Sequence, residues 1–191
     1  MKSLLKVIPL HRNESALIRK AVLGDREAQR LIYERHASKM LSVCRYYIHD
    51  LQFAEDVMIK GFFKVFSSLG EFQSKGSFEG WVRRIMVREC IDYLRVQKNV
   101  FKVEEVDEES VEFEMYEDLY VDAEYIQRMI DNLPDGYRTV FLMYAIEGYS
   151  HKEISDLLSI SESTSKSQLF KARKILKEGV NALKVKENGT A

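Results

Sequence analysis

The chain has 191 residues, of which 46% are apolar, so it is long enough for one packed domain or two small ones. Nine glycines, two prolines and no long alternation of polar and apolar residues predict a mostly helical protein. The N-terminal apolar run is broken by Lys6 and Pro9, which argues against a signal peptide, and no stretch is long enough to span a membrane. Cys44 and Cys90 lie far apart in the sequence and are expected to be small buried residues in a reducing cytoplasm.

The net charge of −1 is an average over three unlike parts of the chain. Residues 1–102 hold 19 Lys or Arg and 11 Asp or Glu, and residues 128–191 hold 10 and 8. Residues 103–127 hold 11 acidic residues and no Lys or Arg. Because like charges at this density extend a chain, and because the helical period breaks here, residues 98–122 are predicted to be an acidic linker between two small helical domains. A plain solubilising hinge would have the same composition.

The spacing of apolar residues predicts an all-α fold, with four helices on each side of the linker. The helices are expected near residues 14–22, 26–48, 51–69 and 78–97, and then near 123–132, 134–146, 151–158 and 162–185. Asp25 and Asp50 are predicted N-caps, and Ser150 with Glu153 is predicted to form a capping box. Pro134 is predicted at a first helical position.

The helix expected over residues 51–69 has two distinct faces. The residues predicted to face the core are Ala54, Val57, Met58, Gly61 and Val65. The residues predicted to face outward are Asp56, Ile59, Lys60 and Phe63. Ile59 and Phe63 are apolar and one turn apart on the outward side, which favours a protein interface. Packing against a neighbouring element of the same domain would use the same pattern.

The loop "GEFQSKGS" (70–77) leads into a helix that is too apolar for a surface helix and too basic for a buried one. At about 100° per residue, Arg84, Arg88 and Arg95 fall within roughly 40° of one another. This arginine strip is predicted to neutralise nucleic-acid phosphates, and Trp81 on its flank is expected to buttress the helix rather than stack on a base. Apolar residues are expected in two arcs, one of Phe78, Val82, Ile85, Tyr93 and Val96 and one of Val87, Ile91 and Leu94.

The segment "SHKEISDLLSISESTSKSQLFKARKIL" (150–176) follows Gly148, which is predicted to end the preceding helix. It reads as a short helix, a tight turn, and a longer helix capped by Ser161. The inward residues are predicted to be Ile154, Leu157, Leu158, Ile160, Thr164, Leu169, Ala172 and Leu176. The opposite side, the recognition face, is Ser163, Lys166, Ser167, Phe170, Lys171 and Lys174. This pattern is typical of a helix-turn-helix that enters a DNA major groove, and a generic helical hairpin with a solvated face is the alternative.

Together these motifs resemble the extracytoplasmic-function (ECF) group of bacterial sigma factors. The resemblance rests on "GDREAQRLIYERHASKMLSVCRYYIHD", "AEDVMIKGFFKVF" and "GSFEGWVRRIMVRECIDYLR", followed by "LPDGYRTVFLMYAIEGYSHKEISDLLSISESTSKSQLFKARKIL". The motifs occur in the family's order and spacing over residues 15–97 and 123–178. The resemblance implies a sigma region 2-like helical bundle over residues 14–97, the linker over 98–122, and a region 4-like helix-turn-helix domain over 123–185.

The resemblance also implies a role for each surface. The outward residues Asp56, Ile59, Lys60 and Phe63 would bind the clamp of the β′ subunit of core RNA polymerase, and the flap of the β subunit would be a second contact. Contacts to the promoter −10 element are implied at Gln73, Ser74, Lys75, Trp81, Arg84, Arg88 and Arg95. Of these, the loop residues Gln73, Ser74 and Lys75 are expected to hold a flipped base, because a splayed base needs a pocket with hydrogen bonds. Contacts to the −35 element are implied for the recognition face.

Five positions depart from the family pattern. Ile59 and Lys60 stand where the family usually has Gln and an acidic residue, and Arg88 stands where an Asn is common. In the recognition helix, Ser165 replaces a usual apolar residue and Gln168 a usual Arg. The promoter sequence is therefore not predicted.

Other function classes explain less of the chain. A helix-turn-helix regulator that ignores core polymerase would account for residues 150–176 but not for the outward face of the helix at 51–69 or for the arginine strip. An enzyme is disfavoured because the four histidines are scattered, neither cysteine has a metal-ligand spacing, and no glycine-rich phosphate loop is present. No catalytic residue, metal or cofactor is predicted. The expected partners are core RNA polymerase and promoter DNA in the cytoplasm, without membrane insertion, and an anti-sigma factor is left open.

Overall fold

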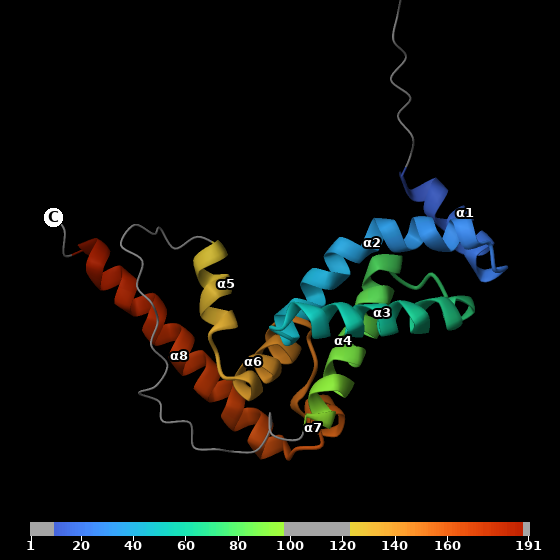
Figure 1. Cartoon of the computed structure of the whole chain (residues 1–191). Coiled ribbons are helices and arrows are strands. Elements are labelled where there is room, and N and C mark those ends of the chain that lie inside the picture. The colour runs from blue at the N-terminus through green and yellow to red at the C-terminus, as the bar shows by residue number, and fades with distance from the viewer. Residues whose placement is uncertain (1–9, 98–122, 189–191) are drawn as a thin grey trace, which may run out of the picture. The chain divides into compact units, whose positions relative to one another are not determined.

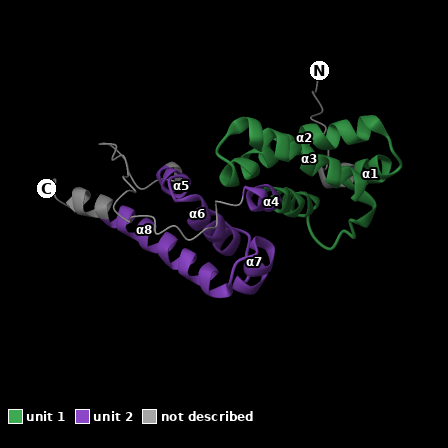
Figure 2. Ribbon diagram, turned by 60° about the horizontal axis from the view of Figure 1, so that its bottom comes forward, with its two compact units in different colours: residues 1–90 green, residues 91–191 purple. Residues whose placement is uncertain are grey.

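The computed structural model describes residues 10–97 and 123–188, so the predicted linker lies outside the described part (Figure 1). Every regular element in these two ranges is helical, as the apolar spacing predicted. The chain forms two compact units, residues 1–90 and 91–191, and the division falls within helix α4 (Phe78–Val96) (Figure 2). The domain boundaries expected at 97 and 123 stay a prediction. Among the described helices, none is long and apolar enough to cross a membrane.

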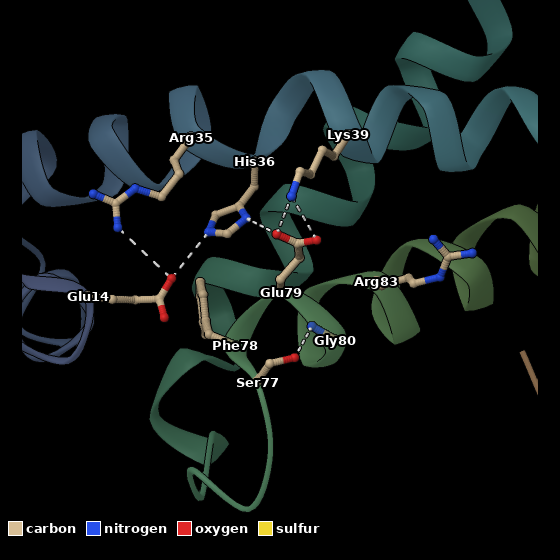
Figure 3. A pocket seen from close by; sticks show the side chains of 9 residues that line it. All are labelled: Glu14, Arg35, His36, Lys39, Ser77, Phe78, Glu79, Gly80 and Arg83. Carbon is tan, nitrogen blue, oxygen red and sulfur yellow. Dashed lines mark hydrogen bonds and ion pairs between the residues drawn. The ribbon is translucent and has the colours of Figure 1, made fainter. Parts of the chain in front are cut away.

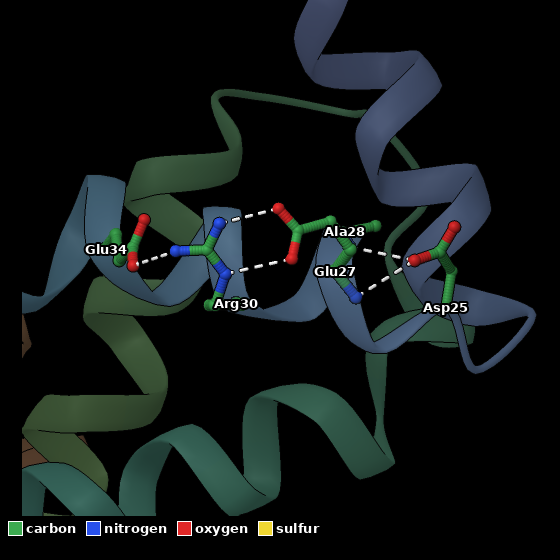
Figure 4. Close-up of polar contacts among 5 residues, drawn as sticks. All are labelled: Asp25, Glu27, Ala28, Arg30 and Glu34. Carbon is green, nitrogen blue, oxygen red and sulfur yellow. Dashed lines mark hydrogen bonds and ion pairs between the residues drawn. The ribbon is translucent and has the colours of Figure 1, made fainter.

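The first unit begins with α1 (Leu10–Val22), α2 (Arg26–Tyr47), α3 (Leu51–Ser67) and the short 3₁₀ turn η1 (Leu69–Glu71). The predicted N-caps are confirmed, since Asp25 accepts hydrogen bonds from the amides of Glu27 and Ala28 (Figure 4) and Asp50 accepts from two amides of α3. Each such cap contributes about 1 kcal/mol. Gly24 before α2 has a φ of +84°, a left-handed conformation that ends α1 without strain.

Exposed ion pairs on α2 contribute little to the stability of the fold. Arg30 bridges Glu27 and Glu34 one turn to either side, with an Nη2–Oε1 distance of 2.6 Å to Glu27 (Figure 4). All three side chains are more than half exposed. Exposed pairs of this kind contribute less than about 1 kcal/mol, so the unit depends on its apolar core instead.

The core of the first unit lies between α1, α2, α3 and α4. The predicted inner face of α3 is confirmed, because Ala54, Val57, Met58, Gly61 and Val65 are all buried. Gly61 lets α4 approach closely, since a Cβ added there would lie 2.3 Å from the sulfur of Met86. Close packing of this kind fixes α4 against α3.

Helix α4 buries most of the residues of its two predicted apolar arcs, but not all of them. Its buried residues are Phe78, Val82, Met86, Val87, Cys90, Ile91 and Leu94. The second predicted arc is confirmed, and so are Phe78 and Val82 of the first. The rest of the first arc is wrong, because Ile85 and Tyr93 are half-buried and Val96 is 76% exposed. Neither predicted arc includes Met86 or Cys90, which are part of the buried surface of the helix.

The two cysteines are buried, as expected, but the fold brings them together. Cys44 in α2 and Cys90 in α4 are free thiols with no exposed surface, and they form a hydrogen bond. The hydrogen bond with Cys44 and burial raise the pKa of Cys90, so Cys90 remains a neutral thiol. Their wide separation in the sequence therefore does not reflect their separation in space.

The second unit contains α5 (Ala123–Asp131), α6 (Asp135–Phe141), the π-helical turn η3 (Leu142–Ile146), α7 (His151–Leu158) and α8 (Glu162–Asn188). Its core includes Leu133, Tyr137, Ala172 and Ile175, and a second cluster joins Tyr125 and Met129 to Leu176 and Val180 of α8. The helix-turn-helix thus rests on α5 and α6.

Local signals in this unit are mostly confirmed. Ser150 and Glu153 form the capping box, Ser161 caps α8 through the amide of Thr164, and Gly148 has a φ of +77° just after the helical segment. Pro134 is instead the N-cap residue, one position before α6 begins, with extended backbone at ψ 140°. The single helix expected over 134–146 turns π-helical after Phe141, because Glu147 donates to the carbonyl of the residue five positions earlier.

Candidate nucleic-acid and polymerase interfaces

The loop before α4 and the first turns of that helix enclose a cavity of about 270 Å³. Gln73, Lys75, Ser77, Trp81 and Arg84 are among its lining residues. Ser74 does not line this cavity, and its φ of 56° places it in the left-handed region. Most loop residues are exposed, so this cavity opens to solvent, and its lining presents amide, hydroxyl and cationic groups together with the carboxylate of Glu71.

Trp81 is held by other aromatic rings, as the sequence predicted. Its ring centroid lies 5.5 Å from Phe72 and 5.8 Å from Phe78, which is itself 2% exposed. Such pairs add about 0.5–1.5 kcal/mol beyond area burial. Trp81 therefore forms a fixed wall of the loop cavity, and its half-buried ring still borders the open space.

The arginine strip on α4 is exposed along its length. Arg84, Arg88 and Arg95 each face solvent, and Arg95 is partly neutralised by Asp92, with an Nη2–Oδ1 distance of 3.0 Å. Exposed ion pairs of this kind exchange easily for a phosphate oxygen. Arg84 also lines the loop cavity, so the strip begins beside the loop.

The outward face of α3 is open, as predicted. Asp56 and Lys60 are exposed, and Ile59 and Phe63 are 43% and 72% exposed. The sequence analysis missed Phe53, which is half-exposed and falls on the same side of the helix, three residues before Asp56. The spacing of three residues between Phe53 and Asp56 could have predicted that Phe53 lies on this face. An apolar pair with charged neighbours on a helix that already buries its inner face suits a protein interface.

The recognition face of α8 is mostly exposed. Ser163, Lys166, Ser167, Phe170 and Lys174 are exposed, and Phe170 is 70% exposed. Lys171 is half-buried, and its ammonium lies 5.8 Å from the centroid of the Tyr137 ring. Lys171 is thus tied to the protein core by a cation–π contact.

Two of the positions that depart from the family pattern lie inside the helix-turn-helix rather than on its recognition face. Ser165 has no exposed surface and Gln168 is 6% exposed. Ser165 hydrogen-bonds to Nδ1 of His151 at 2.9 Å, which ties α8 to the start of α7. His151 also stacks on Tyr144 at 4.7 Å, and burial followed by the charge of Lys166 lowers the pKa of His151. Ser165 and Gln168 therefore affect how α8 is held and not which groups it presents.

Comparisons with known proteins match both halves of the chain. Residues 32–100 match the family model "Sigma-70 region 2", and residues 123–176 match "Sigma-70, region 4". The RNA polymerase sigma-H factor of Pseudomonas aeruginosa is 25% identical over 183 residues, covering 89% of this chain and 95% of that protein. The ECF RNA polymerase sigma factor SigW of Bacillus subtilis is 25% identical over 179 residues, covering 87% and 96%.

A solved structure of CnrH in complex with the cytosolic domain of CnrY is similar at a TM-score of 0.47 and 19% identity, covering 88% of this chain and 97% of CnrH.

The two family models together cover more than half of the chain, and they identify it as a transcription initiation factor of the sigma-70 type. The chain belongs to the extracytoplasmic-function group of sigma-70 family RNA polymerase sigma factors, and it directs RNA polymerase in promoter recognition. It is not an enzyme in its own right. In the two described ranges, no group of three His, Cys, Asp or Glu side chains is placed to hold a metal ion.

Proposed function

We propose that the loop cavity and the arginine strip hold the opened −10 element. The observation that carries this proposal is that the loop cavity and the arginine strip are continuous on α4, since Arg84 lines the cavity and also belongs to the strip. A base flipped out of the duplex needs a hydrogen-bonding pocket and an aromatic wall, which Gln73, Lys75 and Trp81 offer. Arg88 and Arg95 then bind backbone phosphates, which carry no sequence information. Ser74 contributes through the shape of the loop and not through its side chain.

The outward face of α3 is proposed to bind the clamp of the β′ subunit. Ile59 and Phe63 supply apolar surface, and Asp56 and Lys60 supply charges at its edge, which is the usual arrangement of a protein interface. Ile59 and Lys60 replace the family's usual pair, so this contact gains apolar surface at the cost of a negative charge. The β flap is proposed to bind the second unit.

The recognition face of α8 is proposed to bind the −35 element as a duplex. Ser163, Lys166 and Ser167 lie in its first turns, where a recognition helix meets base edges. Lys171 and Lys174 lie farther along and suit phosphates. The site of action is the cytoplasm, where polymerase and promoter DNA are found.

The test separates closed-complex binding from strand opening. Start sites are first mapped by in vitro transcription with purified core polymerase on genomic fragments. Replacing Lys166 with Ala should weaken binding to the upstream duplex by about 1–3 kcal/mol if Lys166 contacts a base. Replacing Arg84 and Arg88 together should spare that contact and reduce permanganate reactivity near the start site.

A pre-melted promoter supplies the control. It should partly rescue the double arginine variant, because strand opening is no longer needed, and it should not rescue the lysine variant. Equal rescue of both variants, or of neither, would mean that the two surfaces do not divide the work in this way.

A further inference from the structure

Phe170 is the one apolar residue among the six that make up the recognition face of α8. Its side chain is 70% exposed. At about 100° per residue, Phe170 falls within roughly 20° of Ser163 and roughly 40° of Lys174, so it lies near the middle of the recognition face and not at its edge. A ring in this position is brought against whatever the recognition face binds.

The side chains around Phe170 are polar. Residues three and four positions away are its neighbours on the helix surface, and these are Ser167, Lys166, Arg173 and Lys174. All four are exposed, and three of them are cationic. Phe63 of α3 is similarly exposed, at 72%, but it has the apolar Ile59 one turn away. Phe170 is therefore a single apolar group surrounded by cations, and not part of an apolar patch.

The packing of α8 keeps this ring at the surface. Leu169 and Ala172 fill the inner side of the helix, at 4% and 0% exposed. The ammonium of Lys171 lies 5.8 Å from the ring centroid of Tyr137, and the guanidinium of Arg173 lies 5.4 Å from that of Tyr144. These contacts fix the rotation of α8 about its own axis, so Phe170 does not turn toward the core.

The surroundings of the ring define the partner that would cover it. A complementary surface carries a single apolar group among negative charges. The major groove of DNA has this chemistry, because phosphates line its edges and the 5-methyl group of thymine is the apolar group on its floor. Helix α8 is the second helix of the helix-turn-helix of sigma region 4, and the second helix is the one that enters the major groove.

We propose that Phe170 contacts the 5-methyl group of a thymine in the −35 element and makes the protein prefer thymine at that base pair. The proposal rests on the proposed binding of the −35 duplex by the recognition face, and it adds one base to what that face recognises. Uracil has the same O4 acceptor as thymine but no methyl group, and cytosine has neither. 5-Methylcytosine carries the same methyl group and is a second source of it.

Thymine and uracil are matched probes, because they differ only in the methyl group. After the start sites are mapped, each thymine of the −35 element is replaced in turn by deoxyuridine. Binding of each duplex to the full chain in complex with core polymerase is measured by fluorescence anisotropy. For the wild type, uracil at the contacted position should weaken binding about fourfold, as expected for one methyl group that is no longer buried.

Variants at Phe170 test whether its ring causes this ratio. Phe170→Ser should bind the thymine and uracil duplexes equally, and Phe170→Leu should keep most of the ratio, because it keeps apolar surface. Leu23→Ala is the control and should leave the ratio unchanged, since Leu23 is 87% exposed in the first unit and belongs to none of the proposed interfaces. A thymine preference that survives Phe170→Ser, or no preference of the wild type at any position, overturns the proposal.

The source of the methyl group is separated by a second set of duplexes. Cytosine at the contacted position should weaken binding, and 5-methylcytosine should recover part of the loss for the wild type and none of it for Phe170→Ser. Such a recovery shows that the ring contacts the methyl group on either base. No recovery restricts the contact to thymine.

Two further outcomes separate this proposal from the proposed function. Lys166→Ala should weaken the thymine and uracil duplexes alike. If Lys166→Ala and Phe170→Ser both leave duplex binding unchanged, the assignment of the recognition face to the −35 element fails, which is distinct from loss of the thymine preference alone. If Phe170→Ser instead lowers affinity for core polymerase, the ring binds protein, and the proposal is overturned.

Discussion

Phe63 offers the sharpest test of how polymerase is bound. Its side chain is 72% exposed on α3, so it contributes little to the fold, and Phe63→Asp should change the free energy of unfolding by less than about 0.5 kcal/mol. A phenylalanine side chain buries about 200 Å² when fully covered, so docking would cover about 140 Å² of Phe63. At about 25 cal/mol per Å², losing this surface costs about 3.5 kcal/mol, or about 400-fold in Kd.

Phe170 on α8 is the matched control. It is 70% exposed, so Phe170→Asp removes almost the same exposed apolar surface from the other unit. Affinity for core polymerase is measured by anisotropy with labelled sigma factor, and circular dichroism checks the fold. We expect Phe63→Asp to lose core binding while Phe170→Asp keeps it and weakens −35 duplex binding. A folded Phe63→Asp variant that binds core as tightly as the wild type would refute the assignment of the α3 face.

Two further predictions concern the fold. Gly61→Ala gains about 1 kcal/mol of helix propensity but forces a methyl group against buried Met86, which costs about 1–3 kcal/mol. Urea unfolding should therefore show a net loss of stability. Gly70→Ala is the control and should show no loss, because nothing lies within 4 Å of its added methyl group. The backbone and hydroxyl of Ser150 donate to Glu153 and lower its pKa, so the cap's contribution is present above the ordinary pKa and is lost as pH falls through the lowered value. An NMR titration should find the Glu153 midpoint below its ordinary value and moved up in Ser150→Ala, and an unchanged midpoint would contradict the capping role.

What the sequence could determine depended on contacts between near neighbours. The caps at Asp25 and Asp50 and the box at Ser150 each involve residues two or three apart, so residue type and spacing were enough to predict them. The outward face of α3 was predicted equally well, because the 3.6-residue period fixes which side chains share a side.

Only the tertiary structure decided features that join distant parts of the chain. Cys44 meets Cys90, and His36 meets both Glu14 and Glu79 (Figure 3), because helices far apart in sequence pack together. Periodicity grouped Val96 with buried Phe78 and Val82, but the core also takes in Met86 and Cys90 and leaves Val96 76% exposed. The 3.6-residue period of a helix determines which side chains share a face. Which face is covered, and by which neighbours, depends on packing between distant segments, and no local sequence pattern encodes that packing.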